Sequence, residues 1–185
     1  MIIAIAGTPG TGKTQVAKAL SIITGFKIIS TKSAALHGAV SGRDAMRKAM
    51  IVDPTKLQKA VNKMIKGDSI IEGMLSHLLK ADIIVVLRCN PTEIQKRLKS
   101  RKWSARKIRE NVQAEILDTI TIEALGKRRK VVEIDTSKKS GKEAALIIKN
   151  MISGKIGKKY NPGSINWTKK YGNYLLDAEF KRFNI

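Results

Sequence analysis

The sequence predicts an α/β fold with a doubly wound, five-stranded parallel sheet. Strand-like and helix-like segments alternate up to about residue 152, as expected where helices cross over between parallel strands. The first apolar run, Ile2–Ala6, has no polar alternation, which is typical of a strand buried on both faces. Hydrophobic residues make up 43% of the 185-residue chain, which is enough for a real core and argues against a disordered polyelectrolyte.

Helical periodicity and cap residues place the elements of the first half. Val16, Leu20 and Ile23 recur at helical spacing directly after a glycine-rich turn. Asp53 is typical of an N-cap and Pro54 of a first helical position, where the amide hydrogen that proline lacks has no helical partner. We therefore expect strands at 2–6 and 26–29, helices after the glycine turn and from 53 to about 66, and a loosely patterned stretch at 30–52.

The second half repeats the alternation of strand and capped helix. Asn90-Pro91 and Ser104 are typical helix starts. Beyond Ser104, one helical face is predicted from four residues that recur every fourth position: Ile108, Val112, Ile116 and Ile120. The other expected elements are strands at 69–71, 82–87 and 131–134, and a closing helix that carries Ala144, Ile148 and Ile152.

The strongest functional signal is a complete Gly-x4-Gly-Lys-Thr motif between the first strand and its helix. Glycines let the backbone curve closely round a phosphate chain, and the amides that open the helix favour the same anion. Lys13 is expected to reach the β and γ phosphates, and the Thr14 hydroxyl to bind Mg²⁺. The sequence predicts a nucleoside triphosphate site formed by Gly7, Thr8, Pro9, Gly10, Thr11, Gly12, Lys13 and Thr14.

A second magnesium contact is predicted at Glu72, which ends the apolar run Ile70-Ile71. Sites in doubly wound sheets form at the carboxyl ends of strands, where a carboxylate beside the phosphate loop can hold Mg²⁺ through water. The alternative is a solvated acid at a strand end.

A basic segment between Lys96 and Arg109 has the character of a lid over the phosphates. Arg97 and Arg101 lie four residues apart on one helical face, where guanidinium groups can stack on a base and bind transferring phosphates. We predict that both are catalytic and that Arg97 also binds the nucleotide. The alternative is a solvated basic helix, which we favour for the other cations, namely Lys96, Lys99, Lys102, Arg106, Lys107 and Arg109.

Weaker candidates lie in the predicted acceptor region, about residues 30–66. His37, Arg43 and Arg47 could hold an acceptor's phosphate, and Arg88 at the end of the fourth strand has similar standing. Each could equally be an ordinary surface residue. Cys89 is expected in the core.

The last 33 residues differ in composition from residues 1–152, so we predict a separate basic, aromatic tail at 153–185. It holds six of the eight aromatic residues of the chain: Tyr160, Trp167, Tyr171, Tyr174, Phe180 and Phe183. Lysines interleaved with aromatic rings are typical of single-stranded RNA recognition. The alternative is that the rings pack on the core and the lysines face water.

Motifs spread over residues 1–152 resemble the archaeal and eukaryotic adenylate kinase isoenzyme-six family. They are the phosphate loop, Ile-Val-Asp at 51–53, Val-Val-Leu-Arg-Cys-Asn-Pro at 85–91, Arg-Leu-x-x-Arg at 97–101 and Glu-Asn-Val-Gln-Ala-Glu-Ile at 110–116. The resemblance implies a P-loop NTPase of the nucleoside monophosphate kinase type with a short lid at about 97–110. It also implies ATP and AMP as substrates, weak ATPase activity, and a role in maturation of the small ribosomal subunit through a ribosomal protein and rRNA.

Three positions depart from the family pattern. The acid-x-His signature after the third strand reads Glu72-Gly73-Met74, and a thioether cannot relay a proton as an imidazole can. The lid sequence Arg-Gly-Tyr is Arg101-Lys102-Trp103, and Arg47-Lys48 stands where relatives tend to be acidic. These changes bear on ATPase activity and acceptor choice more than on ATP binding.

Two functions therefore follow from the sequence. The first is an adenylate kinase that converts Mg·ATP and AMP, or another nucleoside monophosphate, into two diphosphates. The alternative is a nucleotide-switched assembly ATPase that binds rRNA or a ribosomal protein and has little AMP-dependent activity. The net charge of +21 exceeds what a nucleotide-sized acceptor requires and favours some nucleic-acid contact.

The cellular setting is expected to be the cytoplasm. No apolar run approaches the roughly 20 residues of a membrane helix, and the apolar start lacks the basic residues of a signal peptide. A single cysteine suits a reducing compartment. We expect a soluble protein with no membrane partner.

Overall fold

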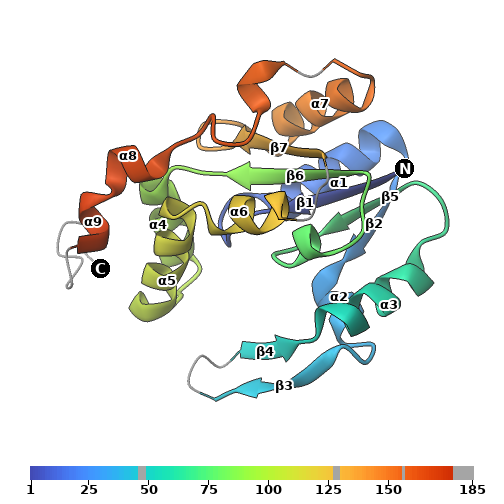
Figure 1. Cartoon of the computed structure of the whole chain (residues 1–185), viewed down its shortest axis with the longest axis horizontal. Helices are drawn as coiled ribbons and strands as arrows, with labels where there is room; N and C mark the ends of the chain where they lie inside the picture. The colour runs from blue at the N-terminus through green and yellow to red at the C-terminus, as the bar shows by residue number, and fades with distance from the viewer. Residues whose placement is uncertain (46–48, 127–129, 156, 177–185) are drawn as a thin grey trace.

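A five-stranded parallel sheet forms the centre of the computed structural model, which describes residues 1–45, 49–126, 130–155 and 157–176 (Figure 1). The strand order is β2-β5-β1-β6-β7, so the chain winds outward from β1 in both directions. The strands are β1 (Ile2–Ala6), β2 (Lys27–Ser30), β5 (Ser69–Glu72), β6 (Ile83–Arg88) and β7 (Lys130–Asp135). The predicted fold class is confirmed.

Both faces of the sheet are covered. Helices α1 (Lys13–Thr24) and α7 (Gly141–Ile152) pack together over one face, with the side chains of Ile3 and Ile5 beneath them. Helices α2 (Thr31–Ala35) and α3 (Pro54–Met64) enclose a second apolar cluster that includes Ile71. Ala4 joins a third cluster beside α6 (Thr119–Leu125). Because alternate residues of β1 enter different clusters, the strand needs apolar residues at every position.

The predicted N-caps are confirmed. The Asp53 carboxylate accepts from the amides of Thr55 and Lys56 at 2.8 and 3.0 Å, and these bonds lower its pKa. Asn90 caps α4 (Pro91–Ser100), and Ser104 caps α5 (Ala105–Ile116). Side-chain acceptors at these positions satisfy amides that have no partner within the helix, so they fix where each helix begins.

The loosely patterned stretch at 30–52 contains more structure than its sequence indicates. After α2, strands β3 (Val40–Asp44) and β4 (Ala49–Val52) pair as a separate antiparallel sheet. The register shifts between Val40 and Gly42, and no residue of β3 is fully buried. An irregular, half-exposed hairpin lacks the apolar alternation that would have predicted it. Arg47 and Lys48 lie outside the described residues.

The helical face predicted from Ile108 to Ile120 is interrupted. Helix α5 ends at Ile116, and Asp118 adopts a left-handed conformation, with φ of 55°, before α6 begins. Ile120 therefore belongs to a second helix and packs against a different cluster from Ile116. A short polar side chain tolerates the left-handed region, which allows the turn here.

The described part of the C-terminal tail lies against the rest of the protein. It comprises η2 (Lys158–Tyr160), which contacts β7, and α8 (Trp167–Tyr171) and α9 (Asn173–Leu176), which run beside α4 and α5 in Figure 1. Tyr171 is 6% exposed and contacts the α4–α5 cluster, while Tyr160 packs on the cluster beneath α7. The described rings therefore follow the docking alternative; Phe180 and Phe183 lie outside the described residues.

Within the described ranges, no helix is both long enough and apolar enough to cross a membrane.

Candidate nucleotide-binding site

The phosphate loop runs from the end of β1 to the start of α1 and depends on its glycines. Gly7 has φ of +140°, and a Cβ there would lie 2.4 Å from the carbonyl oxygen of Leu87 on β6. Gly10 and Gly12 also have positive φ, and Gly12 is the N-cap of α1. Only residues without a side chain allow this backbone path at low cost, and such a path is the kind that lets successive amides face an anion.

Lys13 lies within the curve of the loop. Its Nζ donates to the carbonyl oxygens of Gly7 and Thr8, each at 2.9 Å. Burial lowers the pKa of Lys13 to about 8, against the opposing effect of the carboxylates of Glu72 and Glu115. A lysine held in this way is placed to meet phosphate oxygens and is easily neutralised at alkaline pH.

Thr14 and Glu72 come together at the carboxyl end of the sheet. The Thr14 hydroxyl donates to the Glu72 carboxylate at 3.3 Å, although the residues are 58 positions apart in sequence. Hydroxyl and carboxylate oxygens are ligands that Mg²⁺ prefers, and this ion usually takes few protein ligands and completes its shell with water and phosphate. The described residues contain no cluster of three metal-ligating side chains. The pair therefore fits a nucleotide-bound Mg²⁺.

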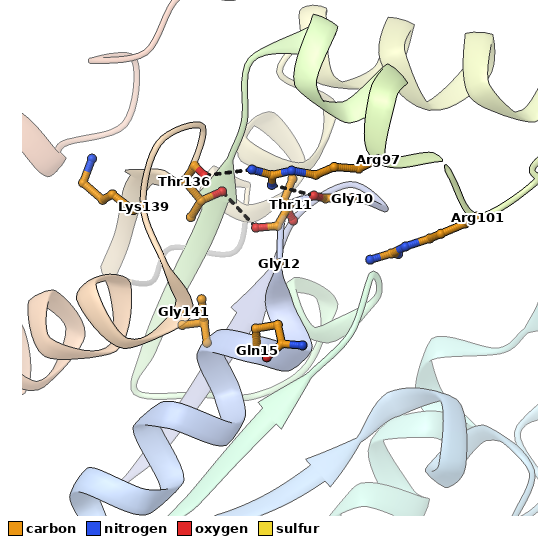
Figure 2. A pocket seen from close by; sticks show the side chains of 10 residues that line it. Gly10, Thr11, Gly12, Gln15, Arg97, Arg101, Thr136, Lys139 and Gly141 are labelled. Atoms are coloured by element: carbon orange, nitrogen blue, oxygen red, sulfur yellow. Dashed lines mark hydrogen bonds between the residues drawn. The ribbon is translucent and has the colours of Figure 1, made fainter. Parts of the chain in front are cut away.

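A pocket of about 230 Å³ continues from the loop (Figure 2). Arg97 on α4 forms one wall: its guanidinium donates to the carbonyl oxygen of Gly10 at 3.0 Å and to that of Ser137 at 3.3 Å. Arg101 extends toward the pocket from the end of the same helix. The pocket is lined by Gly10, Thr11, Gly12, Gln15, Val16, Arg97, Arg101, Thr136, Lys139 and Gly141. The predicted lid arginines thus lie beside the predicted phosphate loop.

The end of α4 sets the position of Arg101. The amide of Lys102 donates to the Lys99 carbonyl at 2.8 Å, and that of Trp103 to the Leu98 carbonyl at 3.2 Å. This pair of bonds is a Schellman motif, in which the residue after the C-cap is left-handed. Lys102 has φ of 57°, so a lysine occupies a backbone conformation that glycine adopts at lower cost. The motif turns the chain sharply directly after Arg101, which is the C-cap of α4 and lines the pocket.

A second hollow, of about 340 Å³, has Glu72 in its wall. It lies between α2, β4 and the turn after β5, within the predicted acceptor region, and Met74 is part of its wall. The lining residues are Ser30, Thr31, Lys32, Ala35, Met50, Val52, Glu72, Gly73, Met74 and Leu75. His37 and Arg43 are exposed and are not among them; His37 instead lies with its Nδ1 3.0 Å from the Ser33 carbonyl.

Arg88 does not face an open acceptor site. Its side chain is 2% exposed, and its guanidinium donates to the carboxylates of Glu115, Asp118 and Glu133. Burial lowers its pKa, but the carboxylates outweigh burial and the pKa stands above the usual value. A strand-end cation looks like a ligand contact in the sequence, but here the end of β6 is enclosed by acids from three places: Glu115 on α5, Asp118 at the N-cap of α6 and Glu133 on β7. Cys89 is buried as expected, and burial raises its pKa to about 11.

The sequence did not single out two residues that touch the loop. Thr136 donates to the Thr11 carbonyl oxygen at 2.9 Å, which ties the end of β7 to the loop. Glu115 accepts a bond from the Thr8 hydroxyl at 2.6 Å, from a side chain that is 2% exposed. An acid among the apolar positions Ile108, Val112 and Ile116 was a signal for a buried polar contact.

This fold and this loop define a P-loop nucleotide-binding protein. A family model described as "AAA domain" matches residues 3–118. Archaeal proteins named "Putative adenylate kinase" match nearly the whole chain. That of Archaeoglobus fulgidus is 41% identical over 98% of this chain and 99% of its own, and that of Pyrococcus furiosus is 42% identical over 92% and 93%. The chain belongs to this family of archaeal putative adenylate kinases.

Solved structures share the fold at low identity. Shikimate kinase from Acinetobacter baumannii has a TM-score of 0.61 at 16% identity and covers 84% of this chain and 95% of its own. The YorR protein from Bacillus subtilis, in complex with phosphorylated GDP, has a TM-score of 0.59 at 20% identity, covering 83% and 96%. Deoxyadenosine kinase from M. mycoides has a TM-score of 0.55 at 15% identity, covering 83% and 99%. These likenesses concern the fold alone.

Proposed function

We propose that the protein is an adenylate kinase, which transfers the γ-phosphoryl group of Mg·ATP to AMP and releases two ADP. The observation that carries the proposal is that Glu72 links the phosphate loop to the second hollow. Its carboxylate accepts from the hydroxyl of Thr14 in the loop, and it also lines the hollow beside α2 and β4. Two phosphate-bearing substrates can thus approach each other over one strand end, and the names of the archaeal relatives agree with this reaction.

Each residue of the nucleotide site has a role that follows from its charge and position. The loop amides and Lys13 bind the β and γ phosphates of ATP, and Arg97 holds the wall of the pocket beside them. Thr14, with Glu72 through water, would hold the magnesium ion, which neutralises phosphate charge when bound. Arg101 reaches toward the same space and stabilises charge that develops on the transferring phosphoryl.

No general base is required. An oxygen of the AMP phosphate attacks the γ-phosphorus, the bond from that phosphorus to the β–γ bridging oxygen breaks, and the bond electrons stay with the departing ADP. The acceptor oxygen is already anionic, so alignment and charge neutralisation carry the reaction. Met74, which lines the acceptor hollow, cannot activate water as a histidine could, and this favours phosphoryl transfer over ATP hydrolysis.

The test is ADP formation from Mg·ATP with AMP, CMP, UMP or GMP, and without an acceptor. The proposal expects turnover that depends on AMP and is abolished by Lys13→Ala. Lys18→Ala is the matched control, because Lys18 is an exposed lysine on the same helix. Turnover that is independent of every acceptor, or unchanged in Lys13→Ala, would contradict the proposal.

A second function, in maturation of the small ribosomal subunit through rRNA and a ribosomal protein, is favoured by the charge of the surface. The chain carries a net charge of +21, and Lys159 and Lys170 lie over the rings of Tyr160 and Tyr171 at 5.1 and 5.3 Å. Lys159 and Lys170 are exposed and can attract phosphates, whereas the buried ring of Tyr171 offers no surface on which a base could stack. In this function nucleotide binding switches the RNA contact and ATP turnover is incidental.

RNA affinity measured across salt concentrations tests this second function. The second function expects RNA affinity that falls steeply with salt concentration. The salt dependence should be weaker in the triple variant Lys159→Ala, Lys169→Ala, Lys170→Ala. The charge-matched control is the triple variant Lys18→Ala, Lys63→Ala, Lys66→Ala. These three lysines are exposed and lie outside the C-terminal tail. Absence of RNA binding at low salt would exclude the second function and leave the kinase alone.

A further inference from the structure

The Glu-Asn-Val-Gln-Ala-Glu-Ile motif at 110–116 has no part in the proposed phosphoryl transfer, yet its second acid contacts the phosphate loop. We propose that Glu115 is a positioning residue, which holds the loop in its nucleotide-binding shape by binding the side chain of Thr8 from α5. This inference rests on the nucleotide site of the proposed function. It gives a role to a residue that lines neither hollow.

The contact between Glu115 and the loop is direct and buried. Oε2 of Glu115 accepts from the Thr8 hydroxyl at 2.6 Å, across 107 positions of sequence. Both side chains are 2% exposed, so water does not compete for the bond. A hydrogen bond to an ionised acceptor in such a place is roughly twice as strong as a neutral one.

The other oxygen fixes the orientation of the carboxylate. Oε1 of Glu115 accepts from Nε of Arg88 at 2.8 Å and from the amide of Cys89 at 3.0 Å. Arg88 in turn donates to Glu133 at 2.6 Å and to the Glu115 carbonyl at 2.9 Å. The carboxylate is therefore attached to β6 and β7 and cannot turn away from Thr8 without breaking several charge-assisted bonds.

Fixing the side chain of Thr8 also fixes the conformation of the phosphate loop. The Thr8 carbonyl oxygen accepts from Nζ of Lys13 and from the hydroxyl of Thr11, each at 2.9 Å. The direction of this carbonyl thus sets the position of the lysine and the curve of the glycine-rich turn. A fixed Thr8 side chain lets the loop meet the phosphates already ordered, which lowers the entropy cost of binding.

A role in folding alone is the competing explanation. Buried ion pairs often add little net stability, and removal of one partner is costly wherever the pair lies. The two explanations differ in where the effect falls. A structural network would lose stability when any member is changed, whereas a positioning role concerns ATP affinity and only the bond to Thr8.

Isosteric substitutions separate them. Thr8→Val removes the donor and leaves Glu115 bound to Arg88 and Cys89, and Glu115→Gln removes the charge. Each is expected to raise the Kd for Mg·ATP about 10-fold, the effect of losing one charge-assisted bond. The double variant should be no worse than either single variant, because both remove the charge-assisted character of the same contact. Thr8→Ser, which keeps the hydroxyl, should restore the wild-type Kd and KM for ATP, while the KM for AMP stays unchanged in all of them.

Thr121→Val is the matched control for stability. Thr121 donates to Glu133 at 2.6 Å and accepts from Nη1 of Arg88 at 3.4 Å, so it belongs to the same network but bonds to neither Glu115 nor Thr8. It should lower the melting temperature without raising the Kd for Mg·ATP. If Glu115→Gln fails to fold, the pair Thr8→Val and Thr8→Ser decides by itself.

Calorimetry on the full chain gives distinct outcomes. Two outcomes overturn the positioning role and leave the proposed function intact. In the first, the folded Thr8→Val variant binds Mg·ATP with the Kd of the wild type. In the second, the losses of Mg·ATP affinity in the two single variants add in the double variant. Absence of Mg·ATP binding by the wild type overturns both.

Discussion

The hydroxyl of Tyr171 donates to Oδ1 of Asn90 at 2.9 Å, which joins the C-terminal segment to the residue that caps α4. The same Oδ1 accepts from the backbone amide of Thr92 at 3.0 Å, and the backbone amide of Asn90 donates to the Ser137 hydroxyl at 2.7 Å. Arg97 lies two turns further along α4, and its side chain forms a wall of the nucleotide pocket. The segment therefore braces the beginning of the helix that carries the lid arginines.

Removal of the Tyr171 hydroxyl should destabilise the protein measurably. Tyr171→Phe keeps the ring in its cluster and loses one bond, so the free energy of unfolding should fall by about 1 kcal/mol. Tyr171→Ala also removes the buried ring and should cost about 3 to 5 kcal/mol. Urea denaturation measures both. If neither variant changes the midpoint, the segment does not brace the core.

Lys102→Gly should stabilise the protein. Lysine in the left-handed conformation after a helix carries steric strain that glycine does not, so the free energy of unfolding should rise by about 0.5 to 1 kcal/mol. Thermal denaturation provides the measurement. Lys96→Gly, in the interior of the same helix, is the control and should cost about 1 kcal/mol. A loss of stability in both variants would show that Lys102 is not strained.

The part of this fold that the sequence predicts is the part with strong local signals. Asp53 and Asn90 were identified as caps because their chemistry is local, and the phosphate loop because its residues are contiguous. Arg88 was considered a candidate acceptor contact and Glu115 was given no role, because their partners come from strands and helices that no periodicity brings together. The β3–β4 hairpin was not predicted for a different reason: it is half-exposed and has no regular apolar pattern.

Gly7→Ala should abolish Mg·ATP binding. A Cβ at Gly7 would lie 2.4 Å from the Leu87 carbonyl oxygen, and both groups belong to backbone that cannot move without separating β1 from β6. Gly25→Ala is the matched control, since Gly25 also has positive φ but has no atoms within 4 Å of the added carbon. It should cost about 1 kcal/mol of stability and leave the Kd for Mg·ATP as in the wild type. Equal effects of the two variants would mean that backbone conformation, rather than the close approach, determines the need for glycine.

The pKa of Lys13 predicts opposite trends in activity and stability at alkaline pH. Burial lowers this pKa from 10.5 to about 8, and kcat/KM for ATP reports the free enzyme, so it should fall with a midpoint near pH 8 as the ammonium that binds phosphate is lost. Between about pH 8 and 10.5 the unfolded chain keeps a proton on Lys13 that the folded chain has released, so this group makes the free energy of unfolding rise with pH. The contribution of Lys13 to stability therefore has the opposite sign to its effect on activity, and the melting temperature distinguishes its titration from unfolding.

Two measurements check this prediction. The first is kcat/KM from about pH 6.5 to about pH 9.5, with the melting temperature followed in the same buffers. Lys13→Arg keeps its charge over this range, so whatever activity it retains should lack the alkaline limb. A wild-type profile that stays flat to about pH 9.5, or a limb that survives in Lys13→Arg, would assign the titration to another group.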